Sequence, residues 1–380
     1  KVRSDRKIVD WEEFKMANPK IFVFAPDTPK RSGDTYAKLE EAGFQLAVGD
    51  QEWRKPGVDA TQSMREFAQG SDAFMGTSTR ANPITRELME ISPNLRIVAK
   101  YSIGVDDIDV EAATELGILV VHGPTEANWG GVAEGTIGMI LALLKKTRER
   151  DEYIKTGKWR DASVQGIYLG QRQDGHEGVT IGIVGLGRIG RRVCDLLAPW
   201  RVRLLAYDPY INKADFNIHD AKESDFETLL KESDVVSMHV LHTKESHHMI
   251  NNETLALMKP SAVLINTARG SVIDEKALTE ALQNDVISAA ALDVFEDEPI
   301  SDDSPLRDLG HKVLLSPHAV QHNVEPGIRA GLGWARDGVI KALAGEVPDH
   351  IYNPEVLPRW RERFEGDYLL PEPVDRYCLF

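Results

Sequence analysis

The sequence predicts an α/β fold made of two doubly wound parallel-sheet domains, on two observations. Short apolar, β-rich runs alternate with polar, helix-like stretches along most of the chain, which is typical of a parallel sheet covered by helices on both faces. The alternation occurs as two series separated by a long apolar helix-like run, and 380 residues are enough for two domains of ordinary size.

The first series covers roughly the first third of the chain. It begins with a short apolar, β-rich run at 20–25 and continues, with polar helix-like stretches between the first of them, through runs at 44–48, 72–76, 84–91, 95–100 and 117–122. The next run, "GVAEGTIGMILALLKKTRER" at 131–150, predicts one long helix with a wide apolar face and a basic end. Such a helix fits a connection between domains or a contact with a partner subunit.

The second series describes one further doubly wound domain. Beyond residue 323 a helix-like run over 326–345 leads into an irregular tail, 346–380, which we expect to pack back on the first domain. We therefore expect a first domain built from 1–124 and 324–380, with a second domain, 125–323, inserted into it. The six strand candidates of the second domain lie at 179–185, 202–208, 234–240, 262–268, 287–295 and 312–316.

The overall charge and the cysteine content exclude several classes of protein. A net charge of −15 has the wrong sign for a phosphate-binding surface, so we expect no nucleic-acid partner, although a local arginine can still hold an anionic substrate. Two distant cysteines without a CxxC motif favour a reducing, cytoplasmic setting. We expect no apolar run long enough to span a bilayer, no membrane partner and no signal peptide.

The segment "GLGRIG" at 185–190 carries the dinucleotide-binding fingerprint. A β-branched run precedes it, a helix-like run follows, and Asp208 ends the next strand 18 residues after the last glycine. Gly185 permits the tight turn, Gly187 lets the backbone approach the pyrophosphate, and Gly190 lets helix and strand pack closely. The free N–H groups and the positive dipole end of the helix then face the phosphates.

Asp208 favours NAD over NADP as the cofactor. A carboxylate at the end of the second strand accepts hydrogen bonds from ribose hydroxyls and repels a 2′-phosphate. Arg191 and Arg192 are the counter-argument, because nearby arginines can hold that phosphate. We expect these arginines to face solvent or to complement other charges, and we expect NAD to be bound.

Arg269, Glu298 and His318 each follow a different strand candidate and together suit one reaction. In an open parallel sheet, ligands bind outside the carboxyl ends of the strands, and the sequence intervals predict that these residues come from neighbouring strands. Reduction of a ketone by hydride needs a proton donor, which His can be near neutral pH, and a carboxylate behind the His orients it. An Arg can hold a keto-acid carboxylate and polarise the carbonyl.

His318 and His322 are four residues apart, a spacing that would also suit a metal site on a helix. A metal needs further ligands, and neither an HExxH motif nor a third His lies nearby in the sequence. The Pro before His318 marks a junction between strand and loop, where helical spacing need not apply. We therefore expect no metal, and we expect His322 to be a polar neighbour of the site.

Seven segments occur in a specific order within residues 20–345: KYSIGVDDID, VAEG, GIVGLGRIG, YDPY, LINTARGSVIDEKAL, ALDVFEDEP and SPH. Together they resemble the D-2-hydroxyacid dehydrogenase family, which includes glyoxylate/hydroxypyruvate reductases and phosphoglycerate dehydrogenases. The resemblance implies a Rossmann NAD-binding domain inserted into a flavodoxin-like substrate domain. It also implies a homodimer formed through the 131–150 helix.

The resemblance assigns roles to individual residues. It implies that Arg269 binds the substrate, that His318 is the acid/base and that Glu298 is its partner, whereas spacing alone would not exclude the acids next to Glu298. The substrate carboxylate would be held by the loop of Ser102, Ile103 and Gly104.

The cofactor residues come partly from the fingerprint and partly from the resemblance. Arg188 and Ile189 would lie at the pyrophosphate, and Asp293 would lie by the nicotinamide. His239 ends a strand and either lines the cofactor site or is a satisfied polar end. The expected cofactor-binding residues are Gly185, Gly187, Arg188, Ile189, Gly190, Asp208, His239, Val240, Thr267, Ala268 and Asp293.

Three functions are compatible with this pattern. The first is an enzyme that interconverts a D-2-hydroxy acid and its 2-keto acid with NAD. The second is an NAD-binding corepressor or scaffold on the same fold, which can keep the same three residues. The third keeps the hydride chemistry but uses formate or phosphite; a Gln in place of Glu298 would have indicated formate, and this chain has Glu.

Overall fold

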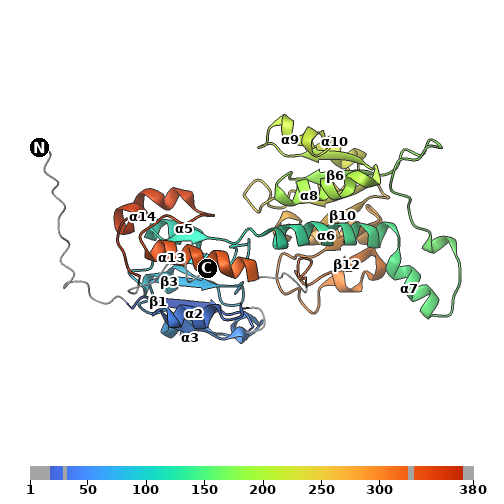
Figure 1. Cartoon of the computed structure of the whole chain (residues 1–380). Coiled ribbons are helices and arrows are strands. Elements are labelled where there is room, and N and C mark those ends of the chain that lie inside the picture. The colour runs from blue at the N-terminus through green and yellow to red at the C-terminus, as the bar shows by residue number, and fades with distance from the viewer. Residues whose placement is uncertain (1–17, 29–31, 324–328, 371–380) are drawn as a thin grey trace, which may run out of the picture. The chain divides into compact units, whose positions relative to one another are not determined.

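The computed structural model describes residues 18–28, 32–323 and 329–370, which are drawn as coloured ribbon in Figure 1. Contacts within the chain divide it into two compact units. The second unit is 126–323, and the first combines the parts of the chain before and after it. Each unit has its own parallel sheet with helices on both faces.

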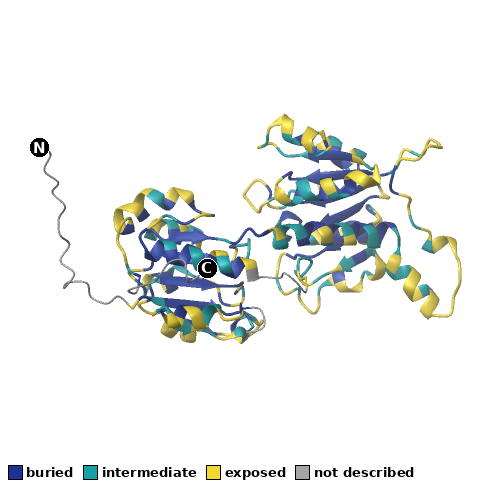
Figure 2. Cartoon of the chain, in the orientation of Figure 1, coloured by how far each residue is buried: buried dark blue, intermediate teal, exposed yellow. Residues whose placement is uncertain are grey.

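The first unit contains a five-stranded parallel sheet in the order β2-β1-β3-β4-β5. The inner strands are buried almost throughout because helices cover both faces, and Figure 2 shows these strands in dark blue. This order is that of a flavodoxin-like sheet, so the predicted fold of this part is confirmed. The strands are β1 (Lys20–Ala25), β2 (Gln45–Val48), β3 (Ala73–Gly76), β4 (Ile97–Lys100) and β5 (Leu119–Val121).

Among the described residues of the first unit, six helices form the two outer layers. Buried side chains of α2, α13 and α14 pack on one face of the sheet, and those of α3, α4 and α5 pack on the other. The helices are α2 (Thr35–Glu41), α3 (Thr61–Ala68), α4 (Arg86–Glu90), α5 (Val110–Leu116), α13 (Arg329–Leu343) and α14 (Leu357–Phe364).

The described part of the predicted tail, 346–370, packs on the first unit, and residues 371–380 lie outside the described residues. Trp360 in α14 is fully buried and donates a hydrogen bond from Nε1 to the backbone oxygen of Arg96 at 3.0 Å. The guanidinium of Arg96 is itself buried and donates to the carboxylate of Asp367 at 2.5 Å. These contacts anchor the tail to the strand that begins at Ile97.

The second unit contains a seven-stranded parallel sheet in the order β12-β11-β10-β9-β6-β7-β8. The six predicted strands are all present in the Rossmann order, which confirms the predicted fold. The seventh, β8, has two exposed residues and no apolar pattern to predict it. The strands are β6 (Thr180–Val184), β7 (Arg203–Tyr207), β8 (Lys222–Glu223), β9 (Val235–Met238), β10 (Val263–Asn266), β11 (Ala289–Leu292) and β12 (Val313–Leu315).

Helices cover both faces of this second sheet as well. Side chains of α6, α8 and α9 pack on one face, and those of α10, α11 and α12 pack on the other. The remaining helix, α7, follows α6 in the chain. The helices are α6 (Glu126–Leu144), α7 (Thr147–Lys155), α8 (Arg188–Leu197), α9 (Lys213–Ile218), α10 (Phe226–Glu232), α11 (Asn252–Leu255) and α12 (Glu275–Gln283).

The prediction of one long helix over 131–150 is wrong, because the chain forms two helices there, α6 and α7. The break falls where the apolar run ends, and Lys146 takes the left-handed conformation with φ of 51°. Lys145 and Lys146 then donate from Nζ to backbone oxygens of Ile167 and Ser163. The two lysines therefore bind backbone oxygens outside α6, and the chain turns at Lys146 instead of continuing this helix.

The expectation that no segment has the length and apolar character of a membrane span is also wrong. By length and composition alone, α6 is apolar enough to cross a membrane. Within the second unit, Met139, Ile140 and Leu143 of this helix are buried against α8 and the sheet. This packing is that of a core helix.

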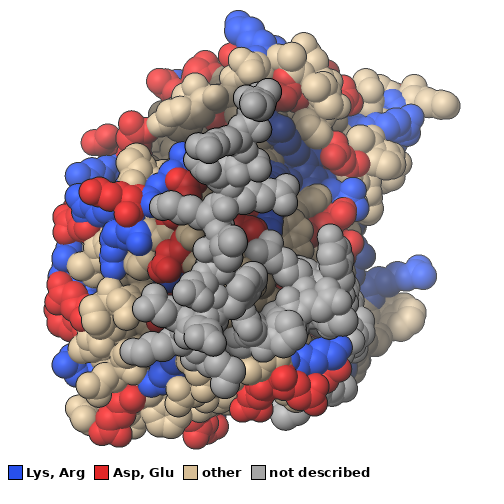
Figure 3. All heavy atoms as spheres, turned by 60° about the vertical axis from the view of Figure 1, so that its left-hand side comes forward, with Lys and Arg blue, Asp and Glu red and all other residues tan. Residues whose placement is uncertain are grey.

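Charged side chains of both signs are interspersed on the face of the molecule drawn in Figure 3. Lysines and arginines lie there among aspartates and glutamates and do not gather into a patch of one sign.

Candidate active site

The candidate catalytic residues follow three adjacent strands of the second unit. Strands β10, β11 and β12 are neighbours in the sheet and run parallel, so their carboxyl ends lie at one edge. Arg269 follows β10, Glu298 follows β11 and His318 follows β12. The prediction that these residues come from neighbouring strand ends is confirmed.

His318 and Glu298 form a direct pair. The imidazole Nδ1 of His318 lies 2.9 Å from each carboxylate oxygen of Glu298. The Oε1 atom of Glu298 also accepts a hydrogen bond from the backbone N–H of Phe295 at 3.2 Å, which helps to hold the carboxylate in place. Nδ1 is thus the ring nitrogen that Glu298 engages, and the contact fixes the orientation of the imidazole.

The neighbouring acid Glu296 is engaged elsewhere. Its carboxylate pairs with Nε2 of His248, and its backbone N–H donates to the carboxylate of Glu275 at 2.5 Å. Burial raises the pKa of Glu275, and the nearby negative charge of Glu296 adds to this shift. The structure therefore selects Glu298 as the partner of His318, a choice that spacing alone leaves open.

Arg269 lies in a loop that packs directly on the backbone after β11. A Cβ atom at Gly270 would lie 1.9 Å from the carbonyl of Phe295, so only glycine allows this approach. The side chain of Arg269 donates from Nη1 to the oxygen of Ala268 at 2.7 Å, and Asn266 donates to the backbone oxygen of Arg269 at 2.9 Å. These contacts bring the loop with Arg269 against the segment that leads to Glu298.

Asp293 is buried at the end of β11, and its carboxylate holds the segment that carries His318. Its Oδ1 atom accepts hydrogen bonds from the hydroxyl of Ser316 at 2.6 Å and from the N–H groups of Ala319 and Val320 at 2.8 and 3.1 Å. The backbone oxygen of Asp293 accepts from the N–H of His318 at 2.7 Å. The sequence places Asp293 by the nicotinamide, and that role stays a prediction.

The glycine-rich loop has the geometry that a dinucleotide needs. Gly185 has φ of +93°, and a Cβ at Gly190 would lie 2.2 Å from the oxygen of Gly185, so both positions require glycine. A Cβ at Gly187 would meet no atom within 4 Å, and no side chain caps the first turn of α8. Open space thus lies beside uncapped N–H groups at the helix start, where Arg188 and Ile189 begin α8, which fits a pyrophosphate.

Asp208 stands directly after β7 and is fixed by the backbone. Its Oδ2 accepts from the N–H of Leu186 at 2.9 Å, and its Oδ1 accepts from the N–H of Tyr210 at 3.0 Å. Arg191, one of the two arginines that could have favoured NADP, donates from Nε to the oxygen of Leu186 and pairs with Asp215 at 3.4 Å, whereas the expectation for Arg192 stays a prediction. The carboxylate is therefore presented next to the glycine-rich loop, while Arg191 is engaged with other groups.

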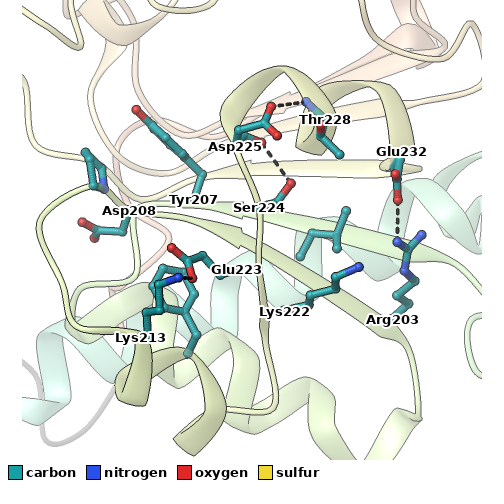
Figure 4. Close-up of a pocket in the computed structure, with 13 residues that line it drawn as sticks. Arg203, Tyr207, Asp208, Lys213, Lys222, Glu223, Ser224, Asp225, Thr228 and Glu232 are labelled. Carbon is teal, nitrogen blue, oxygen red and sulfur yellow. Dashed lines mark hydrogen bonds and ion pairs between the residues drawn. The ribbon is translucent and has the colours of Figure 1, made fainter.

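A hollow of about 450 Å³ opens beside Asp208, between β7, β8, α9 and α10. Figure 4 shows Asp208 at one end and the ion pair of Arg203 with Glu232 at the other. A second pair, Lys213 with Glu223, lies between them at 3.5 Å. The candidate catalytic residues at the ends of β10, β11 and β12 do not line this hollow, which shares only Asp208 with the predicted sites.

His239 lies directly beneath the glycine-rich loop. A Cβ at Gly185 would be 2.8 Å from the carbonyl of His239, and the His239 ring contacts the hydroxyl of Ser237 through Nε2 at 2.9 Å. Burial lowers the pKa of His239 to about 3, so the ring is neutral. Its Nδ1 atom is buried without a hydrogen-bond partner among the described residues, which is unlike a satisfied polar end and leaves the place at the cofactor site as a prediction.

Val240, Thr267 and Ala268 follow the carboxyl ends of β9 and β10. Thr267 is buried and shares a hydrogen bond with the hydroxyl of Thr136 in α6 at 2.9 Å. The N–H of Ala268 donates to the side chain of Asn266 at 3.0 Å. The structure thus places these predicted cofactor residues at the same sheet edge as Arg269.

The predicted substrate loop, Ser102–Gly104, belongs to the first unit and follows β4. Sequence reasoning missed the buried ion pair beside it, in which Nζ of Lys100 lies 2.6 and 2.7 Å from the carboxylate oxygens of Asp107. Asp107 also accepts from the N–H of Thr79 at 2.6 Å, so the pair joins two loops at this edge. The sequence feature that could have indicated this ion pair is an acidic residue seven positions after a lysine that lies in an apolar strand.

His318 and His322 do not share a helix. His318 has φ of 52°, and the N–H of His322 donates to the oxygen of Ala319 within a turn. Among the residues that the structure describes, no group of three or more His, Cys, Asp or Glu side chains is arranged to hold a metal ion. His322 is exposed at the end of this turn.

Comparison with known proteins identifies the family. Residues 137–319 match the family model described as D-isomer specific 2-hydroxyacid dehydrogenase, NAD binding domain. A glyoxylate reductase from Thermofilum pendens is 37% identical over 348 residues, which are 90% of this chain and 96% of that protein. A D-3-phosphoglycerate dehydrogenase from Archaeoglobus fulgidus is 34% identical over 304 residues, 80% of this chain and 55% of that protein.

A solved structure shows the same fold. The crystal structure of a glyoxylate reductase from Paecilomyes thermophila matches with a TM-score of 0.74, covering 89% of this chain and 99% of that one at 24% identity. Together with the family model, this similarity makes the second unit a Rossmann-type NAD-binding domain. The chain therefore belongs to the D-2-hydroxyacid dehydrogenase family of NAD-dependent oxidoreductases, which interconvert hydroxy acids and keto acids.

Proposed function

We propose that this protein reduces a small 2-keto acid to the D-2-hydroxy acid with NADH, and catalyses the reverse reaction with NAD. The observation that carries the proposal is the pair of His318 and Glu298, with Nδ1 2.9 Å from both carboxylate oxygens. This pair lies at the same sheet edge as Arg269 and in the same unit as the glycine-rich loop. Such a pair is what a proton donor for a developing alkoxide requires.

The proposed chemistry divides the work among the three residues. The bound cofactor supplies the hydride that adds to the keto carbon. His318 gives the proton on Nε2 to the carbonyl oxygen, while its Nδ1–H stays hydrogen-bonded to Glu298, which stabilises the protonated ring. Arg269 holds the substrate carboxylate and polarises the carbonyl. In the reverse direction His318 accepts the hydroxyl proton.

Further residues have proposed binding roles of their own. The loop of Ser102, Ile103 and Gly104 holds the substrate carboxylate through backbone groups, and Asp208 accepts hydrogen bonds from the ribose hydroxyls of NAD. The first unit is thus the substrate domain and the second the NAD-binding domain, with boundaries near 125 and 323. With Cys194 a buried free thiol, a reducing cytoplasmic compartment suits the protein.

A panel of 2-keto acids tests the proposal directly. The purified chain is mixed with NADH or NADPH and with glyoxylate, hydroxypyruvate, pyruvate or 3-phosphohydroxypyruvate, and cofactor oxidation is followed by absorbance. We expect turnover with at least one unphosphorylated acid and NADH. If every acid fails while NADH still binds, the proposed reaction is wrong and the corepressor or scaffold alternative replaces it.

Replacing Asp208 by alanine is expected to reduce the preference for NADH over NADPH. The variant loses the carboxylate that accepts ribose hydroxyls and repels a 2′-phosphate, and it keeps the catalytic pair intact. The measurement is kcat/KM for both cofactors with one keto acid. Asp225→Asn, at a helix N-cap that also borders the hollow of Figure 4, is the matched control. An unchanged cofactor ratio in Asp208→Ala would contradict its placement at the ribose.

The proposed assembly is a homodimer. The segment after α6 exposes four large apolar side chains, of which Trp159 is 71% exposed, and Figure 2 shows α7 and the chain after it largely in yellow. Exposed apolar groups gathered on one segment are typical of a subunit interface. Light scattering should give a mass twice the 42.3 kDa of one chain. The variant Trp159→Glu should lower this measured mass towards that of one chain. A monomeric wild type contradicts the proposal. The four side chains are Ile154, Trp159, Ile167 and Tyr168.

A further inference from the structure

The segment 316–320, here called the histidine turn, is held from one side by Asp293. One buried carboxylate accepts hydrogen bonds from Ser316, Ala319 and Val320, the residues on either side of His318. His318 itself has φ of 52°, a left-handed conformation that is unfavourable for any residue with a Cβ. The hydrogen bonds that Asp293 accepts offset the free-energy cost of this conformation. Its carboxylate binds donor groups that lie close together because the chain turns at His318.

The opposite side of the histidine turn rests on helix α6. A Cβ at Gly135 would lie 2.0 Å from Cγ2 of Val320 and 2.7 Å from the backbone oxygen of Val320. Gly131, one helical turn earlier, faces Asn323 and Gln321 in the same way, at 2.7 and 3.3 Å. Val320 of the turn therefore packs on a position of α6 that has no side chain, and the residues directly after the turn pack on Gly131 in the same helix.

We propose that Gly135 and Asp293 are positioning residues that clamp the histidine turn between α6 and β11 and so fix His318 against Glu298. This inference rests on the proposed role of His318 as proton donor. Neither residue has to touch the substrate for this effect. A shift of the turn moves the imidazole of His318, whose contacts with Glu298 are only 2.9 Å long.

Gly135→Ala is the sharpest test, because its effect on activity should exceed what its effect on stability explains. Alanine is a better helix former than glycine, which offsets part of the cost of the overlap, but its Cβ pushes Val320 and with it the histidine turn. We expect kcat to fall about 10–100-fold, as misplacement by about 1 Å can cause, with a lower Tm, a chain that is still folded at the assay temperature and an unchanged Kd for NADH. If Tm falls while kcat of the folded variant is kept, the role of Gly135 is merely structural and the clamp is refuted.

Gly138→Ala is the matched control on the same helix. A Cβ at Gly138 meets no atom within 4 Å, so this variant should keep kcat and raise Tm by about 2–4 °C. The double variant Gly135→Ala/Val320→Ala removes the methyl group that lies 2.0 Å from the new Cβ and should regain part of kcat. Light scattering on each variant shows whether its assembly matches that of the wild type.

Asp293→Ala tests the other side of the clamp independently. Alanine removes the oxygen that accepts hydrogen bonds from Ser316, Ala319 and Val320, so the histidine turn loosens. We expect kcat to fall about tenfold or more while the Kd for NADH is kept. If the Kd for NADH rises and kcat at saturating NADH is kept, Asp293 contacts the cofactor and its place in the clamp is refuted.

The outcomes separate this inference from the proposed function. An active wild type whose kcat is unchanged in Gly135→Ala overturns the clamp and leaves the proposed reaction standing. A loss of kcat in Gly138→Ala equal to that in Gly135→Ala also overturns it, because the position of the added methyl group would then be irrelevant. A wild type that reduces no keto acid refutes the proposed function itself, and the clamp with it.

Discussion

Replacing His318 by alanine is expected to lower kcat for keto-acid reduction by about 10²–10⁴-fold, the usual cost of losing a positioned general acid. The variant removes the only proposed proton donor and leaves the carboxylate of Glu298 without its imidazole partner. The Kd for NADH should stay close to that of the wild type, because the glycine-rich loop is untouched. Steady-state kinetics and fluorescence titration with NADH measure the two quantities.

His322→Ala is the control for this experiment, since His322 lies in the same turn region and is exposed. We expect it to retain nearly full kcat. The kcat of Glu298→Gln should lie between those of His318→Ala and His322→Ala. The amide oxygen can still accept from Nδ1–H but no longer carries the charge that favours the protonated ring. Wild-type turnover in His318→Ala would rule out the proposed proton donor.

Replacing Arg269 by alanine is expected to lower kcat/KM for the keto acid by about 10²–10³-fold, the cost of removing one strong donor from a developing oxyanion. The guanidinium is proposed to hold the substrate carboxylate and to polarise the carbonyl. Arg269→Lys should recover little, because an ammonium cannot form two parallel hydrogen bonds to a carboxylate. Kinetics over a range of keto-acid concentrations at saturating NADH measure the loss.

Arg172→Ala is a suitable control for the loss of a positive charge. Arg172 is exposed and pairs locally with Asp174, so its removal should leave kcat/KM unchanged. If Arg269→Ala behaves like Arg172→Ala, the substrate does not use Arg269. If Arg269→Lys restores full activity, a point charge is sufficient and the bidentate contact is not required.

Much of the fold follows from local sequence pattern. The strands of a parallel sheet are short and apolar because helices cover both of its faces. They therefore alternate with helix-like stretches in a pattern that is visible in the sequence. The strand β8 was missed because two exposed residues, Lys222 and Glu223, form it only by pairing with β7. The break between α6 and α7 at Lys146 was missed because distant carbonyl groups, those of Ile167 and Ser163, bind the two lysines.

The two sheets, the dinucleotide loop and the three strand ends that carry Arg269, Glu298 and His318 could be predicted, because they depend on residue type and on spacing along one chain. The folded structure shows that Glu298, and not Glu296, meets His318. It alone showed that Gly135 makes room for the histidine turn. The physical reason is the same for both findings. Each depends on which atoms meet between elements that are far apart in sequence, and the spacing of residues along the chain does not indicate such contacts.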